Sequence, residues 1–115
     1  MNRGEVWWAL LEPRSGAEQQ GRRPVVLVAH QGFLDVPSWH SLVVVPVSTS
    51  SRQSRRGPTV VPLGEAPSGL SADSVALCHQ VTTLDRSKIE RHIGTLPDEA
   101  MSRLEAGLKA AMGLS

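Results

Sequence analysis

The chain has 115 residues and a formal net charge of +1, with 40% hydrophobic and 20% charged residues. This length fits one domain, residues 1–115, that buries roughly two thirds of its unfolded surface, and the composition excludes wholesale disorder. The single cysteine, Cys78, excludes an internal disulfide and a cysteine-based zinc site. No apolar run approaches the ~20 residues of a membrane span, and the N-terminus does not resemble a secretory signal. We therefore expect a cytoplasmic protein that contacts no membrane.

Four apolar segments in the first part of the chain predict β-strands. They are residues 5–11, 24–29, 42–47 and 59–63. The second and third are β-branched without polar alternation, so we expect them to be buried on both faces. Pro46 and Pro62 lie within two of these segments and indicate edge strands or bulges. A longer strand is predicted over residues 74–84.

The C-terminal segment changes to helical spacing. Beyond Pro97, apolar residues form one helical stripe, namely Met101, Leu104, Leu108, Ala111 and Met112. Gly113 is a natural helix end. The sequence therefore predicts a mainly β fold, a small barrel closed by one C-terminal α-helix.

Charge is unevenly placed along the chain. Residues 1–60 carry seven basic and four acidic side chains, a net +3, whereas residues 61–115 carry a net −2. The arginines after Arg3 in the first half fall in residues 14–23 and 52–56, which we expect to be loops. A basic face built from these loops would suit phosphates. Solubilising loop charge explains the counts equally well.

Several segments resemble the MazF/PemK family, the toxins of toxin–antitoxin pairs. The strongest is GAEQQGRRP at residues 16–24, and further segments match in order at residues 3–7, 45–50, 69–75, 80–81, 83–86, 93–96 and 112–114. The resemblance implies an SH3-like barrel of the CcdB/PemK type that forms a homodimer. It also implies a ribosome-independent, sequence-specific endoribonuclease that needs no metal or other cofactor. Its substrate would be single-stranded mRNA, and a cognate antitoxin with an acidic disordered segment would inhibit it.

The resemblance places the active site at Arg23 and Ser48. Metal-free RNA cleavage must stabilise charge on the phosphoryl oxygens, and the rigid guanidinium fork of Arg23 suits that task. Ser48 is assigned to positioning the phosphate. Two alternatives stay open, because Arg23 could instead pair with Glu18, and Ser48 could be a turn serine whose neighbour Thr49 serves.

The chain departs from the family pattern just before Gln80. Some members have an arginine and an acid where this chain has Leu77 and His79. We hypothesise that His79 acts as the base toward the 2′-hydroxyl, because histidine titrates near neutral pH. The alternative is that it only faces solvent or RNA. Expected RNA contacts are Glu18, Gln19, Gln80, Thr49 and Arg52.

Two other functions compete with RNA cleavage. One is a CcdB-like toxin that binds DNA gyrase without catalysis, against which the block at residues 18–24 argues. The other is an RNA-binding barrel that has lost nuclease activity, which Leu77 and His79 make conceivable.

Overall fold

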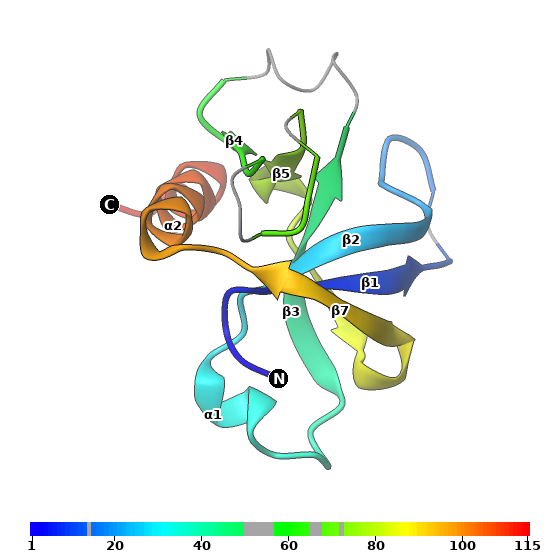
Figure 1. Ribbon diagram of the computed structural model, residues 1–115. Coiled ribbons are helices and arrows are strands. Elements are labelled where there is room, and N and C mark those ends of the chain that lie inside the picture. Colours follow the sequence, from blue (N-terminus) through cyan, green and yellow to red (C-terminus); the bar gives the residue numbers. More distant parts are fainter. Residues whose placement is uncertain (14, 50–56, 65–67, 72) are drawn as a thin grey trace.

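The computed structural model describes residues 1–115 except residues 14, 50–56, 65–67 and 72. Its centre is an antiparallel sheet in the strand order β4-β5-β3-β2-β1-β7, and β6 also pairs with β3 (Figure 1). The strands are β1 Glu5–Leu11, β2 Gly21–Leu27, β3 Ser41–Ser48, β4 Val60–Pro62, β5 Val75–Leu77, β6 Thr82–Asp85 and β7 Ile89–Thr95. The helices are α1 Gln31–Leu34 and α2 Asp98–Met112, with 3-10 turns η2 Cys78–Gln80 and η3 Arg86–Lys88.

The strands predicted at residues 5–11, 42–47 and 59–63 correspond to β1, β3 and β4. The strand predicted at 24–29 begins earlier, at Gly21, so Arg22 and Arg23 lie in β2 and their placement in a loop was wrong. The reason is that β1 continues to pair with this stretch up to Gly21. Strand geometry therefore fixes the direction of both arginine side chains.

The single strand predicted over residues 74–84 was also wrong, because the η2 turn divides it into β5 and β6. The Cys78 amide donates to the carbonyl of Thr59, and the Val81 amide donates back to the Cys78 carbonyl at 3.2 Å. These bonds replace a continuous ladder. The chain consequently turns where His79 and Gln80 are found.

Pro46 lies in β3, inside the sheet rather than at its edge, so the edge prediction holds only for Pro62 in β4. Along one side, β3 pairs with β6 through residues 41–44 and with β5 through residues 47–48. Pro46 sits between these two ladders, where its missing amide hydrogen removes no bond to either strand.

Alternating side chains of β1, β2 and β3 build two apolar clusters. The first contains Val6, Val26, Val45 and Val47 and extends to α2. The second contains Ala9, Val25, Leu27, Leu42 and Val44. Burial on both faces was predicted for this part of β3, and Val43 contradicts it because its side chain is exposed.

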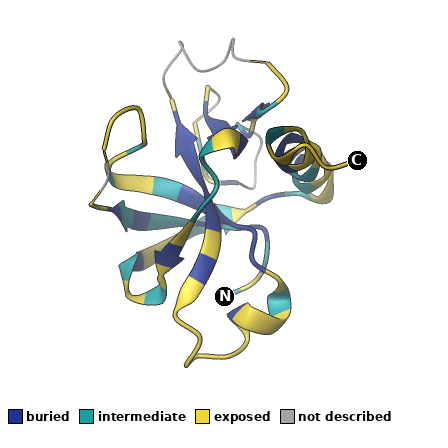
Figure 2. Ribbon diagram, turned by 180° about the vertical axis from the view of Figure 1, so that it is seen from behind, coloured by how far each residue is buried: buried dark blue, intermediate teal, exposed yellow. Residues whose placement is uncertain are grey.

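Helix α2 covers the first cluster beside β4 and η2 (Figure 1). Its buried face is formed by Ala100, Leu104, Gly107 and Leu108, whereas Met112 at the end of the predicted stripe is exposed. Figure 2 shows the outer side of this helix exposed. Gly113 ends the helix at a φ of 68°, as predicted. The mainly β fold with a C-terminal helix is thus confirmed. None of the helices in the described ranges is long and apolar enough to cross a membrane.

Candidate nucleic-acid interface

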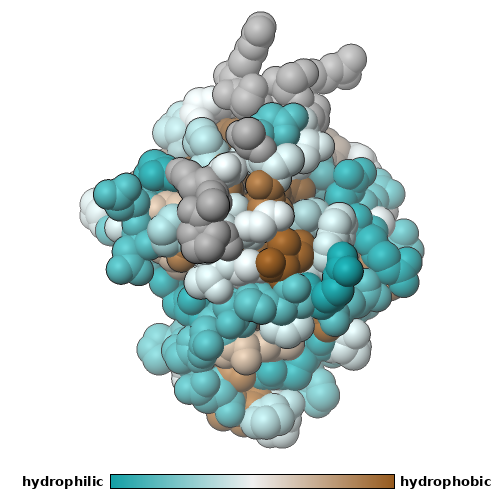
Figure 3. All heavy atoms as spheres, viewed as in Figure 1, coloured by the Kyte–Doolittle hydropathy of each residue, from teal (hydrophilic) through white to brown (hydrophobic). Residues whose placement is uncertain are grey.

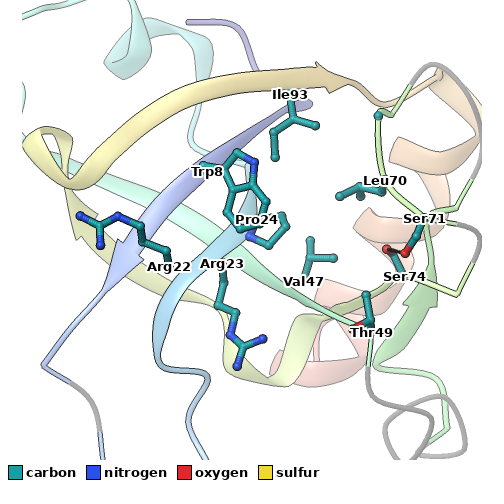
Figure 4. Close-up of a pocket in the computed structure, with 11 residues that line it drawn as sticks. Trp8, Arg22, Arg23, Pro24, Val47, Thr49, Leu70, Ser71, Ser74 and Ile93 are labelled. Atoms are coloured by element: carbon teal, nitrogen blue, oxygen red, sulfur yellow. Dashed lines mark hydrogen bonds between the residues drawn. The ribbon is translucent and has the colours of Figure 1, made fainter.

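Two surface hollows lie beside the β2 and β3 strands. The apolar hollow, about 260 Å³, is bordered by Trp8, Pro24, Val47, Leu70 and Ile93, with Arg22, Arg23, Thr49, Gly69, Ser71 and Ser74 completing its lining (Figure 4). The polar hollow, about 230 Å³, is bordered by Glu18, Gln19, Pro46, His79, Gln80, Val81 and Thr82. On the face viewed in Figure 3, apolar atoms reach the surface and hydrophilic side chains surround them.

Strand alternation assigns side chains to these hollows. Trp8 pairs with Pro24, and both border the apolar hollow. Val25 pairs with Pro46, which borders the polar hollow. Because directly paired residues share a face and successive residues alternate, the Arg23 side chain leaves β2 on the face of Val25 and Pro46. The two hollows therefore flank opposite faces of the β2–β3 ladder. Arg23 nevertheless also lines the apolar hollow.

The same register brings Arg23 and Ser48 to one side. The β2–β3 ladder pairs Val25 with Pro46 and Leu27 with Val44. The ladder ends at the Val25–Pro46 pair, and beyond it β3 pairs with β5 through Val47 and Ser48. Alternation along each strand still gives Arg23 the face of Val25 and Ser48 the face of Pro46. The family resemblance assigns the active site to Arg23 and Ser48, and these two residues thus come from neighbouring strands of one sheet.

The side chain of Arg23 is exposed and partly fixed. Its Nε–H donates to the Gln20 carbonyl at 3.0 Å, and its terminal nitrogens make no hydrogen bond or ion pair within the described part of the chain. Figure 4 shows it pointing away from Trp8 and Pro24, and away from Arg22. Arg22 instead forms an ion pair with Glu90 at 3.0 Å. Arg23 therefore retains a fork of donors for an external anion.

His79 stands in the η2 turn with a defined partner. Its Nδ1 lies 3.0 Å from the hydroxyl of Thr59, and its side chain borders the polar hollow. A histidine with one nitrogen held in this way presents the other nitrogen in a fixed direction. Thr59 was not foreseen as a site residue, because no sequence pattern links positions 59 and 79.

Ser48 and Thr49 occupy different positions at the end of β3. Ser48 is 6% exposed and pairs with Val75, whereas the exposed Thr49 borders the apolar hollow. Glu18, Gln19 and Gln80 meet at the polar hollow as one group with His79. The predicted contact Arg52 lies outside the described residues.

Cys78 anchors the η2 turn to the core. Its thiol is buried, lies 3.7 Å from the Leu104 carbonyl of α2, and, together with Val61, lies against Gly107 of that helix. Burial raises the pKa of the Cys78 thiol to about 11. A neutral, buried thiol is a structural group, as the sequence indicated. Among the residues described, His, Cys, Asp and Glu side chains form no group of three or more suited to a metal ion.

Comparison with known proteins identifies one family. A family model described as PemK-like, MazF-like toxin of type II toxin–antitoxin system matches residues 2–112. The endoribonuclease MazF of Staphylococcus saprophyticus is 31% identical over 115 residues, covering 99% of this chain and 92% of that protein.

Solved structures show the same fold. The crystal structure of MazF from Deinococcus radiodurans superposes with a TM-score of 0.80 at 24% identity, covering 99% of this chain and 97% of that one. A mycobacterial endoribonuclease in complex with its cognate antitoxin superposes with a TM-score of 0.75 at 20% identity, covering 100% of this chain and 95% of that one.

Proposed function

Because the chain belongs to the PemK-like, MazF-like family of toxins of type II toxin–antitoxin systems, we propose that it is a sequence-specific endoribonuclease that cuts single-stranded mRNA without a ribosome or a metal ion. The name of its relative from Staphylococcus saprophyticus, an endoribonuclease, supports RNA cleavage over gyrase binding. The observation that carries the proposal is the alternation along β2 and β3, which gives Arg23 and Ser48 the same face of the sheet as Pro46, a residue that borders the polar hollow.

The reaction needs no group beyond those on this face. The 2′-hydroxyl oxygen attacks the adjacent phosphorus, and its proton passes to a base. The bond from phosphorus to the 5′-oxygen breaks, and that oxygen takes a proton. The products are a 2′,3′-cyclic phosphate and a 5′-hydroxyl end. Extra negative charge builds on the phosphoryl oxygens at the transition state, where preorganised donors lower the barrier most.

Arg23 supplies those donors. Its bond to the Gln20 carbonyl fixes the base of the guanidinium and leaves the terminal nitrogens directed outward. Ser48 positions the phosphate from the facing strand, while Thr49, on the apolar-hollow side, contacts the neighbouring part of the RNA. Glu18 and Gln19 read base edges in the polar hollow.

His79 is the base in this proposal. It is the histidine that borders the polar hollow, and the hydroxyl of Thr59 holds its Nδ1. The other ring nitrogen, Nε2, then exchanges the proton with the 2′-hydroxyl. The same imidazolium returns the proton to the leaving 5′-oxygen, so the histidine ends as it began.

The partners follow from charge and from the relatives. A homologous mycobacterial endoribonuclease has been solved with its cognate antitoxin. For this chain we propose an antitoxin whose acidic segment lies over Arg23 and competes with RNA, since residues 1–60 carry a net +3. The working unit is a homodimer, and its place is the cytoplasm, where mRNA is found.

The test compares two neighbouring arginines. Arg23→Ala removes a guanidinium from the proposed site, whereas Arg22→Ala removes the same charge from the opposite face of β2. We expect RNA cleavage to fall at least 100-fold in Arg23→Ala, in line with loss of one transition-state donor, which costs about 10²–10³. Cleavage by Arg22→Ala should stay within a few-fold of wild type. Equal losses in the two variants would show only a general charge effect and contradict the assignment.

A further inference from the structure

The side chain of Gln80 joins the η2 turn to the loop between β1 and β2. Its Oε1 accepts a hydrogen bond from the Gln19 amide at 2.9 Å, and its Nε2 donates to the Ala17 carbonyl at 3.1 Å. The side-chain amide thus pairs with the loop backbone as a neighbouring strand would. This loop carries Glu18 and Gln19 to the polar hollow.

The described residues of this loop also make hydrogen bonds between near neighbours in sequence. The Glu18 amide donates to the Ser15 carbonyl, the Ser15 hydroxyl donates to a Glu18 carboxylate oxygen at 3.3 Å, and the Gln20 carbonyl accepts from Arg23. The two hydrogen bonds of the Gln80 side chain, here called the Gln80 clamp, instead join residues that are 61 and 63 positions apart in the sequence. The clamp joins the loop to the η2 turn, which also bears His79. Losing it would remove two hydrogen bonds that join one wall of the polar hollow to the other.

We propose that Gln80 is a positioning residue, and that it sets RNA specificity by fixing Glu18 and Gln19 against the η2 turn. The inference rests on the proposed endoribonuclease function. It changes the role expected of Gln80, because the carbonyl oxygen and one amide hydrogen of its side chain are used within the protein. The residues that contact the RNA bases are then Glu18 and Gln19, in the loop that Gln80 holds in place.

The first test needs no RNA. In Gln80→Leu, which keeps the size and removes both bonds, we expect hydrogen exchange of the Gln19 amide to speed up on the order of tenfold, as for loss of one ordinary hydrogen bond. Gln80→Glu keeps an acceptor for the Gln19 amide and should restore much of its protection. Unchanged exchange in Gln80→Leu would overturn the proposal.

A matched control is available at Gln31. Its side chain also bonds to backbone, accepting from the Arg3 amide and donating to the Met1 carbonyl. Gln31→Leu therefore removes comparable amide bonds away from the two hollows. We expect it to leave Gln19 exchange unchanged. Faster Gln19 exchange in this control would mean a general loosening and would contradict a specific clamp.

The second test uses RNA. In Gln80→Leu we expect KM for the preferred RNA to rise about tenfold and cleavage to spread to related sequences, with kcat within a few-fold of wild type. A fall in kcat with Gln19 exchange unchanged would make Gln80 a direct participant and overturn the positioning role. If the wild-type protein cuts no RNA, the proposed function fails, and the exchange experiment still decides whether Gln80 holds the loop.

Discussion

Gly107 is the point where helix α2 meets the η2 turn, and its replacement by alanine tests this contact. A Cβ at position 107 would lie 2.8 Å from Cys78 Sγ and 2.8 Å from Val61 Cγ2. Favourable contacts between such atoms lie near 3.5–4.0 Å, so the new methyl overlaps two buried neighbours. Cys78 precedes His79 and Gln80 directly, and a shift of Cys78 would therefore move the polar hollow.

The expected free-energy change has two opposing parts. Replacing a helix-interior glycine by alanine alone stabilises a helix by about 1 kcal/mol. Overpacking a dense core costs about 1–3 kcal/mol. We therefore expect Gly107→Ala to lower the free energy of unfolding by about 1 kcal/mol on balance.

Urea unfolding followed by tryptophan fluorescence measures this change. The exposed neighbour Ala106 gives the control, since Ala106→Gly reports helix propensity with no packing change. In the double variant Gly107→Ala/Cys78→Ala the overlap with sulfur is gone, and we expect part of the loss to return as a coupling energy of about 1 kcal/mol. An increase in stability in the single variant, or strictly additive effects in the double variant, would refute the close packing of α2 on η2.

Three further outcomes follow from the structure. Ser48→Ala should reduce the rate of RNA cleavage more than Thr49→Ala, because strand alternation gives Ser48 the face of Arg23, whereas Thr49 shares with Arg23 only the lining of the apolar hollow; the reverse order in single-turnover assays would contradict this assignment. Thr59→Val should lower the rate of RNA cleavage more than Thr59→Ser, because only the serine variant keeps a hydroxyl beside His79 Nδ1, and equal rates would contradict a role for this contact. Identical pH–rate profiles for wild type and His79→Ala would exclude His79 as the base. Burial raises the pKa of Cys78 to about 11, above its value in the unfolded chain. The stability that this thiol contributes is therefore fully present at neutral pH. The free energy of unfolding should fall as pH rises from about 9 to 11, because the unfolded chain then loses a proton that the native state keeps. Urea titrations at pH 8 and pH 10.5 should show a larger loss for wild type than for Cys78→Ala, and equal losses would contradict a buried thiol.

Sequence patterns predicted the elements whose formation depends mainly on the spacing of their own apolar residues. Bulky apolar runs formed β1, β3 and β4, and the stripe after Pro97 formed α2. They failed at residues 74–84, because the η2 turn depends on a bond from the Cys78 amide to Thr59 and on packing against Gly107. Both partners are distant in sequence, and a single sequence carries no signal for such contacts.

For the candidate site, too, features set by one segment could be predicted from the sequence, whereas features set by contacts between distant segments could not. Alternation along β2 alone could have separated Arg22 from Arg23, once the start of the strand at Gly21 was known. The pairing of β2 with β3, which gives Val25 and Pro46 and hence Arg23 and Ser48 a common face, is a matter of register, which the sequence does not reveal. The role of Gln80 as a clamp is likewise visible only from its bonds to the loop.

Metal-free cleavage by attack of the 2′-hydroxyl is the central claim, and mapping of RNA ends tests it most directly. The purified protein is incubated in EDTA with a long single-stranded RNA, and then with a short RNA that carries one 2′-deoxynucleotide at the mapped cut. We expect discrete cuts that leave 2′,3′-cyclic phosphate and 5′-hydroxyl ends, and no cut at the deoxy position. RNA that stays intact in EDTA, or cutting that survives the 2′-deoxy substitution, would contradict the account.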